Sequence, residues 1–401
     1  MSSVNPGLAA AAPPGVRLRD PGTADDGAQV SAAPDLIASA FACDRTLSTT
    51  AALDLAVALG ADLAGPGQGG TTELWEALAD VAARDLGAAR TVEPHLDALA
   101  ILGQLPAPDR DRMAAVGAGS ESTWGVFAAE GPGVRLEAHP AVGPAVDAAG
   151  ASHVLTGTKP WCSLAGSLTH AVVTAHLPAD GTDGAAAGGP GTRQAFAVDL
   201  RDPGVVVAEA PWAGLGLPSV PSGPVEFTGV PAVPVGGPGW YLSRPGFAWG
   251  GIGVAACWYG GAVGVARLLA AQARQRGDGL DQIGAMLLGQ VDTALFAART
   301  ALAAAAATID RGDDELLDDP GRLALRVRAV VADAAESVLR AVGHGTGPAP
   351  LAFDAAHAQR VADLQLYLRQ EHAERDRAKL GASLLGSGSS GTAIEDEELP
   401  W

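Results

Sequence analysis

The sequence predicts an α+β multidomain protein. We expect an N-terminal helical domain, a middle antiparallel β-barrel or sandwich domain, and a C-terminal four-helix bundle. The apolar pattern changes its period twice along the chain, and Gly- and Pro-rich breaks separate the periodic segments. The 401 residues are 48% hydrophobic, which is enough for sizeable cores. The expected segments are a disordered 1–32, domains at 33–118, 119–240 and 241–386, and a disordered acidic tail at 387–401.

The first region, 36–105, has a helical pattern. Thr71 is a plausible N-cap, and Leu74, Leu78 and Val81 follow with the spacing of one helix face. The stretch "TVEPHLDALAILGQL" continues as a second buried helix, in which His95 is expected to be a satisfied core histidine. These patterns favour a compact helical domain.

Short apolar runs replace the helical period between 124 and 235. The runs "HAVVTAHL", "QAFAVDL", "GVVVAEA" and "GPVEFTGV" are bounded by Gly, Pro and Asp turns, as in antiparallel sheets. The insert "PADGTDGAAAGGPGT" between two of these runs is expected to be a flexible loop.

Long Ala-, Leu- and Val-rich segments then follow, and they predict helices at 249–275, 281–310, 319–341 and 355–385. The break "GHGTGPAP" separates the last two. Helices of this length, each with one apolar stripe, typically pack as a four-helix bundle.

Composition excludes several classes of function. The 26 basic and 45 acidic residues give a net charge of −19, which disfavours nucleic acid and anionic lipid as partners. The three cysteines lack the spacing of a zinc site or a disulfide framework, so we expect buried thiols and no metal. With neither a signal-type segment nor an evident membrane span, a cytoplasmic location is expected.

Five motifs occur in an order that is similar to one family. They are "LTGTKPWCS", "GLGLPSVPSGPVEFTGVPAVPVGGPGW", "RPGFAWGGIGVAACWYGGAVGVARLL", "VDTALFAART", and "HGTG" followed by "QRVADLQLYLRQEH". Together they resemble the acyl-CoA dehydrogenase superfamily over about 33–385. The resemblance implies FAD as cofactor, acyl-CoA or a related small acyl substrate, and an electron-transfer partner. It also implies a homodimer or homotetramer.

The segment around Trp161 carries the predicted flavin site. On a regular strand, side chains two residues apart share a face, so Trp161 and Ser163 would both face a flat ring. By the resemblance, Trp161 flanks the flavin, Ser163 reaches it, and Cys162 lies between them. Lys159 is expected to be solvated, because Pro160 disturbs the ladder. A tryptophan that fills a β core beside a turn serine is the alternative.

The resemblance adds further cofactor residues. In "WGVFAAEGPG", Phe127, Ala128 and Ala129 correspond to the segment beside the flavin pyrimidine, where backbone N–H groups donate. Arg276 and Gln282, in "RQRGDGLDQ", are the nearest candidates for residues that a neighbouring subunit contributes. Here the family's T-F-G element is missing. Gly345 and Gly347 would let the chain approach a phosphate or adenine, and a helix break that needs a positive φ explains them equally well.

Glu371 is the predicted catalytic base, because it lies eight residues after Asp363, as the resemblance requires. A desolvated carboxylate with a raised pKa suits the abstraction of a proton beside a thioester carbonyl. The following "EHAERD" predicts a continuous charged helix, whose usual meaning is a solvated face. The lesser candidates for a base are His372, Glu374 and Glu130. The candidate substrate-binding residues are Arg244, Phe247 and Trp249.

Two other functions stay open. The same fold and flavin serve monooxygenases, which need no Glu base. A catalytically silent relative that binds acyl-CoA or serves an assembly is the second alternative. Three elements of the family are missing here: the T-F-G near Arg276, the G-S-D that follows the segment beside the flavin pyrimidine, and the E-G-T at the catalytic glutamate. Fold alone does not decide between these reactions.

Overall fold

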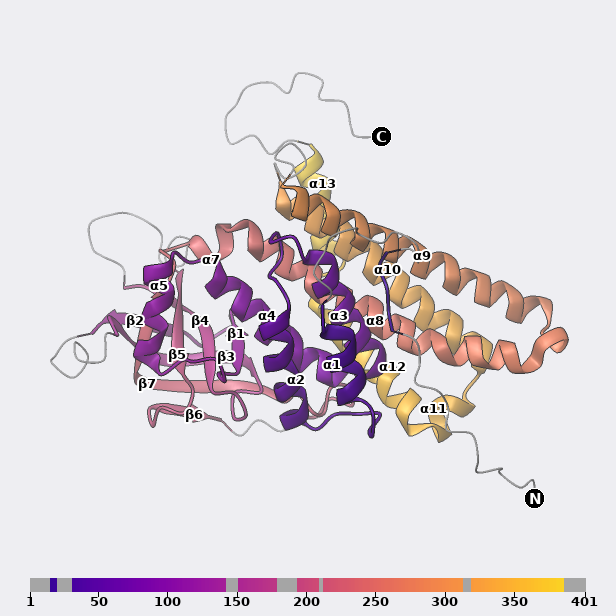
Figure 1. Cartoon of the computed structure of the whole chain (residues 1–401), viewed down its shortest axis with the longest axis horizontal. Helices are drawn as coiled ribbons and strands as arrows, with labels where there is room; N and C mark the ends of the chain where they lie inside the picture. Colours follow the sequence, from indigo (N-terminus) through magenta and orange to yellow (C-terminus); the bar gives the residue numbers. More distant parts are fainter. Residues whose placement is uncertain are drawn as a thin grey trace.

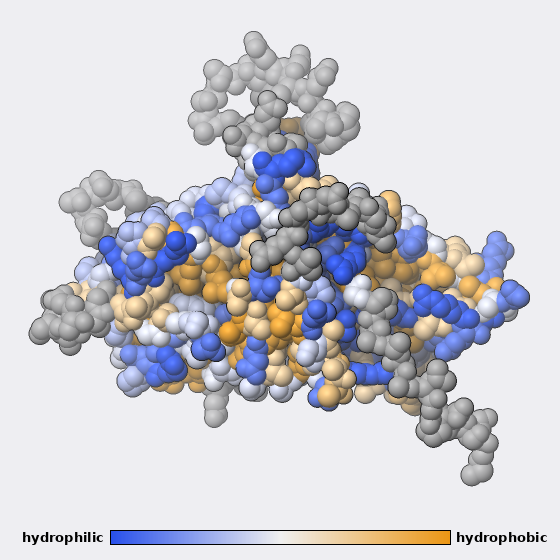
Figure 2. Space-filling view, in the orientation of Figure 1, coloured by the Kyte–Doolittle hydropathy of each residue, from blue (hydrophilic) through white to orange (hydrophobic). Residues whose placement is uncertain are grey.

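The computed structural model describes residues 15–19, 31–141, 151–178, 193–208, 212–312 and 319–385. Figure 1 shows a strand-rich part at one end and long helices that extend to the other, with the N-terminal helices between them. This arrangement confirms the predicted mixture of helix and sheet with a helical C-terminal region. In Figure 2, apolar residues appear mostly over the middle of the same face, where these parts meet.

The N-terminal helices pack around α3 and α4. Their bounds are α1 (Ala33–Ala40), α2 (Thr49–Asp62), α3 (Thr71–Arg84), α4 (Leu86–Gly103) and α5 (Ala107–Asp111), followed by the 3-10 turn η1 (Arg112–Val116). α4 begins where the Asp85 side chain accepts hydrogen bonds from the backbone N–H groups of Gly87 and Ala88 at 2.8 and 3.1 Å. This N-cap satisfies two backbone donors that the helix itself leaves unpaired.

The described residues contain seven strands, of which five close a barrel and two join it at its side. They are β1 (Trp124–Phe127), β2 (Leu136–Pro140), β3 (His153–Ser163), β4 (His170–His176), β5 (Arg193–Asp199), β6 (Val205–Val207) and β7 (Ser222–Val235). The pairings β4–β2–β3–β7–β5 close the ring through β4–β5, while β1 joins β4 and β6 joins β7. β1 and β2 each run parallel to β4, so the prediction of a purely antiparallel sheet is wrong. Parallel pairing is possible because long connections separate these strands in the sequence.

The C-terminal region is organised around α8. Its elements are α7 (Trp240–Ser243), α8 (Pro245–Arg276), η3 (Gly277–Gly279), α9 (Gln282–Arg311), α10 (Pro320–Thr346), α11 (Ala349–Phe353), α12 (Ala355–Tyr367), η4 (Leu368–Gln370) and α13 (Glu374–Leu384). α8 contacts α3, α4, α9, α10 and α12. α8 therefore packs against both the N-terminal helices and the other helices of the bundle.

α8 is also long and apolar enough to cross a membrane by length and composition, contrary to the expectation that no such segment exists. However, 78% of its most apolar window is buried inside the structure, as in a core helix. Small residues make this burial possible. A Cβ at Gly260 would lie 2.1 Å from the carbonyl oxygen of Ala79 in α3.

Four local predictions need correction. Thr71 is the first residue of α3 and not its cap, because its hydroxyl donates to Asp310 of α9 at 2.5 Å. Residues 15–19, expected to be disordered, include Val16 and Leu18, which are buried and donate backbone hydrogen bonds to Asp80 and Glu76. "GHGTG" continues α10 as far as Thr346. "EHAERD" is broken, because Ala373 adopts a φ of 47° before α13 begins.

Other predictions lie outside the described residues. These are the disorder expected for 1–14, 20–30 and 387–401, and the loop at 179–192.

We expect Gly260→Ala to destabilise the protein by about 1–3 kcal/mol, because the added methyl group would push α3 away from α8. Gly289→Ala is the matched control. It is an exposed glycine within α9, and no described atom lies within 4 Å of the added methyl group. It should stabilise the helix by about 0.5–1 kcal/mol. Chemical denaturation of both variants measures the difference, and equal effects would contradict the proposed packing.

Candidate functional site

The two segments predicted to hold the flavin, around Glu130 and around Lys159, lie side by side in the structure. Lys159 of β3 donates to Glu130 Oε1 at 2.7 Å and to Thr174 Oγ1 at 2.9 Å. A Cβ at Gly131 would lie 3.1 Å from Pro160 Cγ. Lys159 is only 1% exposed, so the prediction of a solvated lysine is wrong. The lysine instead ties the end of β1 to β3.

Glu130 is the centre of this charge cluster. His176 Nε2 lies 3.0 Å from one carboxylate oxygen, and Arg193 Nη1 lies 3.3 Å from the other. Partial burial raises the pKa of Glu130, but hydrogen bonds from Lys159 and His176 outweigh it and lower the pKa to about 2. Glu130 is therefore an anion at neutral pH, and its structural role rules against the lesser prediction of a base.

A bulge in β3 changes the direction of the predicted flavin residues. The pairing with β7 slips between Lys159 and Cys162, and Trp161 adopts a φ of 58°. The expected alternation is therefore interrupted, and the strand period alone no longer decides whether Trp161 and Ser163 share a face. The bulge leaves the indole of Trp161 62% exposed. The alternative of a tryptophan that fills the β core is excluded by this exposure.

Cys162 takes the inward position beside Trp161. It is 1% exposed, and its Sγ–H donates to the Lys159 carbonyl at 3.3 Å. Burial raises the pKa of this thiol to about 12, so it remains protonated at neutral pH. Phe127, another predicted cofactor residue, is 2% exposed and belongs to the core, whereas Ala128 and Ala129 lie closer to the surface.

Ser163 faces α4. Its hydroxyl forms a hydrogen bond with Ser222 Oγ at 2.7 Å and accepts one from Arg90 Nη2 at 3.4 Å. The Arg90 guanidinium also lies over the ring of Tyr367 in α12, 5.8 Å from its centroid. Arg90 thus connects the barrel, the N-terminal helices and the bundle.

Arg90, Glu93 and Asp97 form one polar face of the otherwise apolar α4, with spacings of three and four residues. Glu93 is 8% exposed, and Arg90 Nη1 lies 3.5 Å from its Oε2. Burial outweighs the attraction of Arg90 and raises the pKa of Glu93 to about 7. Burial also raises the pKa of Asp97, against the opposing effect of Arg244. At neutral pH, α4 therefore carries a proton-exchanging acid inside the protein.

The bundle helices also contain buried polar groups, which belong to Trp258, Arg328 and Tyr367. Arg328 of α10 lies 4.6 Å from the centroid of the Trp258 ring, which packs edge-on against Tyr367. Trp258 Nε1 is buried and has no hydrogen-bond partner within the described part of the chain, whereas the buried hydroxyl of Tyr367 interacts with the Cys257 thiol. Because an unpaired buried donor is costly, Trp258 Nε1 indicates a place where a ligand or water completes the network.

Glu371 lies at the break between α12 and α13. It is 7% exposed, and Arg328 Nη2 lies 3.3 Å from its Oε2. Burial raises the pKa of Glu371, while Arg328 opposes the shift. The carboxylate is thus desolvated, as predicted for a base, but it faces a guanidinium. His372 and Glu374 are exposed, so they lack the desolvation expected of a base.

The predicted substrate residues lie where the bundle begins. Arg244 is 5% exposed, donates to Gln104 Oε1 at 3.3 Å, and lies 5.2 Å from the centroid of Tyr241. Phe247 packs edge-on against Tyr241 and is 44% exposed. Trp249 lines a small cavity with Trp75, Glu93 and Asp97. Arg244 and Trp249 therefore converge on α4, and Phe247 lies further out.

The remaining predicted cofactor residues lie elsewhere. Arg276 and Gln282 are exposed beside the α8–α9 turn, at the end of the bundle opposite the barrel in Figure 1. Gly347 ends α10 with a φ of 67°, as the helix-break alternative requires, whereas Gly345 is helical. A Cβ at Gly345 would lie 2.7 Å from Leu269 Cδ1, so this glycine permits helix packing.

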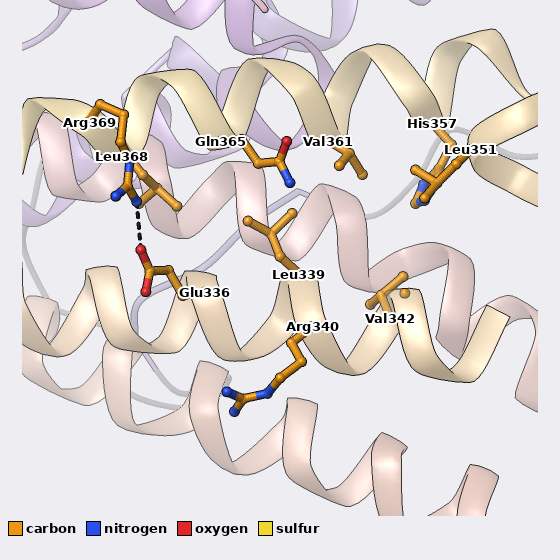
Figure 3. A pocket seen from close by; sticks show the side chains of 11 residues that line it. Glu336, Leu339, Arg340, Val342, Leu351, His357, Val361, Gln365, Leu368 and Arg369 are labelled. Carbon is orange, nitrogen blue, oxygen red and sulfur yellow. Dashed lines mark hydrogen bonds and ion pairs between the residues drawn. The ribbon is translucent and has the colours of Figure 1, made fainter. Parts of the chain in front are cut away.

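A larger groove of about 480 Å³ lies between α10 and α12. Figure 3 shows Leu339 and Gln365 directed between the two helices, while Arg340 points away toward a lower helix. Arg369 and Glu336 form an ion pair of 2.6 Å across one end. The groove is separate from the barrel contacts of Trp161 and Ser163.

Sequence reasoning missed Arg90, Glu93, Asp97 and Arg328. A signal was present on α4, because three charged residues with helical spacing interrupt an apolar pattern. Arg328 gave no comparable signal, since arginines are frequent in the charged faces of α10. No group of three or more His, Cys, Asp or Glu side chains suited to a metal occurs in the ranges that the structure describes.

The sequence matches no protein-family model. It is 32% identical over 187 residues to the amino sugar nitrososynthase DnmZ of Streptomyces peucetius. That match covers 45% of this chain, and the chain spans only 43% of the length of that relative.

Solved structures show a likeness over most of the chain. KijD3, in complex with FMN and dTDP-3-amino-2,3,6-trideoxy-4-keto-3-methyl-D-glucose, has a TM-score of 0.69 and 20% identity, with 90% of this chain and 92% of that chain covered. FMN-bound TdsC from Paenibacillus sp. A11-2 has a TM-score of 0.70 and 17% identity, with 88% of this chain and 96% of that chain covered. PigA with FAD and proline has a TM-score of 0.71 and 16% identity, with 91% of this chain and 100% of that chain covered. At these identities the likeness concerns the fold alone.

We predict that Glu93→Gln changes how stability depends on pH. In the wild type the pKa rises from 4.5 to about 7 on folding, so the folded state holds the proton more tightly. Stability is therefore lost as pH rises from 4.5 to 7, by about 3 kcal/mol from this group. Arg90, Asp97 and Arg328 are the charged groups around it.

Glu93→Gln removes this loss. The unfolding free energy of the variant, relative to wild type, should increase across that interval and level off above it. Denaturation at half-unit pH steps measures the difference, and a difference independent of pH would contradict the assignment.

Proposed function

We propose that this chain is a flavin-dependent monooxygenase that acts on the amine of a sugar nucleotide. The observation that carries the proposal is the exposed indole of Trp161, which a positive-φ bulge holds beside Ser163. A large aromatic side chain exposed by a strained backbone suggests a surface that a ligand covers. The similarity to an amino sugar nitrososynthase and to KijD3 supports the choice of substrate.

The residues present fit a flavin. A flavin ring needs a flat apolar partner and donors toward its polar edge. Trp161 provides the flat partner, and the Ser163 and Ser222 hydroxyls with the Arg90 guanidinium provide polar groups nearby. The ring of Tyr367, whose hydroxyl is buried beside the Cys257 thiol, lies beneath Arg90.

A bound reduced flavin would supply the electrons that activate dioxygen. The protein's own residues would position the substrate and accept the proton of its ammonium group. An amine attacks only as the neutral base, so the ammonium proton must first leave. The Glu93 carboxylate, with a pKa of about 7, is suited to accept that proton. The buried indole of Trp75, which lines a cavity with Glu93, helps to keep water from this carboxyl group.

Dehydrogenation of an acyl thioester is the second candidate. Burial of Glu371 and its raised pKa favour it, and this reaction needs acyl-CoA and an electron-transfer partner. Arg328 weighs against it, because a guanidinium 3.3 Å away stabilises the anion and reduces its basicity. Anaerobic bleaching of the flavin by acyl-CoA, lost in Glu371→Gln, would favour dehydrogenation over oxygenation.

We expect Trp161→Ala to weaken flavin binding by about tenfold or more, because stacking on an aromatic ring contributes on the order of 1–3 kcal/mol. Phe353→Ala, at a 90% exposed aromatic on α11, is the control and should bind flavin as the wild type does. Fluorescence titration with FMN and with FAD measures both affinities.

Equal flavin affinity in all three proteins would contradict the site, and failure of the wild type to take up either flavin would remove both enzyme functions. The same titration tests the expectation of FAD, since the similar structures hold FMN or FAD.

A homodimer or homotetramer and a cytoplasmic location remain proposals. Arg276 and Gln282, exposed at the α8–α9 turn, support association, because they are available to a flavin only if a second copy holds it. Light scattering of the flavin-loaded protein should give a mass above that of one 40.0 kDa chain. A monomer that binds flavin would contradict this arrangement.

A further inference from the structure

The loop at 212–221, which leads into β7, lies directly against α12. A Cβ at Gly216 would overlap the carbonyl oxygen of Ala362, so the two backbones are in contact. Gln359 Nε2 of α12 donates to the Leu215 carbonyl at 2.9 Å. The helix therefore determines the course of this loop.

Asp363 of α12 anchors the loop at its most strained residue. The carboxylate is 7% exposed, and its Oδ1 accepts hydrogen bonds from the Leu217 N–H at 2.5 Å and from Gln359 Nε2 at 2.7 Å. Leu217 is buried and has a φ of 51°, a left-handed conformation that is costly for a leucine. Such a conformation persists where its surroundings fix it, and the bond to Asp363 does so here.

Hydrogen bonds connect this anchor to Ser163. The Val220 N–H donates to the Leu217 carbonyl at 3.0 Å, and the Ser222 hydroxyl donates to the Val220 carbonyl at 3.3 Å. Ser222 Oγ then forms the 2.7 Å hydrogen bond with Ser163 Oγ. The position of the Ser163 hydroxyl thus depends on where Asp363 holds the loop.

α12 also supports the second partner of Ser163. Arg90 Nη2 donates to Ser163 Oγ at 3.4 Å, and its guanidinium lies over the ring of Tyr367. Tyr367 follows Asp363 by four residues, so the two lie on the same face of α12. One helix face therefore supports both Ser222 and Arg90 where they meet the Ser163 hydroxyl.

We propose that Asp363 is a positioning residue of the flavin site, which directs the Ser163 hydroxyl toward the ring through the loop at 212–221. The inference rests on the proposed function, because it assigns the flavin to Ser163. Asp363 acts as a hydrogen-bond acceptor. Asn in its place keeps an acceptor oxygen, whereas Ala leaves the Leu217 N–H buried and unpaired.

The first test is fluorescence titration of the full-length protein with FMN. Asp363→Ala should weaken binding by about two- to tenfold, as expected for the loss of one hydrogen bond to the ring. Asp363→Asn should bind FMN nearly as the wild type does. Asp333→Ala, which breaks an exposed ion pair with Arg377, is the control and should have no effect.

A double-mutant cycle separates positioning from a general loss of structure. In the Ser163→Ala background, Asp363→Ala should cause no further loss of affinity, because the hydroxyl that it positions is absent. If Asp363→Ala does not fold, Gln359→Ala tests the same route, since it removes a donor to Asp363 and the contact with Leu215. This variant should weaken FMN binding about twofold, and only when Ser163 is present.

The second test needs no flavin. Hydrogen–deuterium exchange of the protein without flavin should be faster in Asp363→Ala than in the wild type, in peptides that cover 215–222 and 161–164. Asp363→Asn should keep the slow exchange, and peptides of α9 should be the same in all three proteins.

Equal losses of affinity with and without Ser163, equal losses in the Asn and Ala variants, or unchanged exchange at 161–164 would each overturn the inference. Failure of the proposed function has a different result. The wild type would then take up no flavin, while exchange would still show whether Asp363 controls the segment around Ser163.

Discussion

The burial of charge on α4 is the constraint on which the site depends. Glu93 of α4 is buried, while Arg90 and Asp97 on the same face are half-buried, and Arg90 reaches the barrel through Ser163. Charges in such a place must find partners or lose their ionisation. Arg90 finds Ser163 and the ring of Tyr367, but the two acids are incompletely neutralised. Arg90 and Arg328 attract Glu93, and Arg244 attracts Asp97, but burial outweighs them and raises the pKa of both acids.

Two other buried cations hold the surroundings of this region in place. Lys159 joins β3 to Glu130 and thereby supports the bulge that exposes Trp161. Arg328 donates to the carbonyl oxygens of Gly251 and Gln370, at 2.7 and 2.9 Å, and so joins α8 to the turn that carries Glu371. These contacts explain how strained backbone at Trp161 and Ala373 persists, because buried ionic contacts on each side fix the neighbouring residues.

Sequence periodicity predicted the order of helices and strands, because long apolar segments leave few ways to bury their faces. The bounds of α8, α9 and α10 lie close to the predicted segments. Predictions failed where one residue decides the outcome. A bulge at Trp161 breaks the two-residue period, a positive φ at Ala373 breaks a charged helix, and the glycines at 343 and 345 remain helical. Such local choices depend on tertiary contacts that the local pattern does not contain.

The candidate site was predictable only in part. The segments around Ala128 and Trp161 were found through motifs, and the structure places them together through Glu130 and Lys159. Glu93 and Asp97 were visible as charged residues on an apolar helix, but their importance depends on the burial that α3 and α8 impose. The parallel approach of β1 and β2 to β4 was not predictable from alternation, which is the same for both strand directions.

The proposed flavin ring lies against Trp161 and Ser163, beside the charged residues of α4. A crystal structure of the protein with FMN tests it most directly. We expect the ring to contact the Trp161 indole, with a polar edge toward Ser163 and Arg90. A ring bound instead in the groove between α10 and α12, with Trp161 still exposed to solvent, would contradict it.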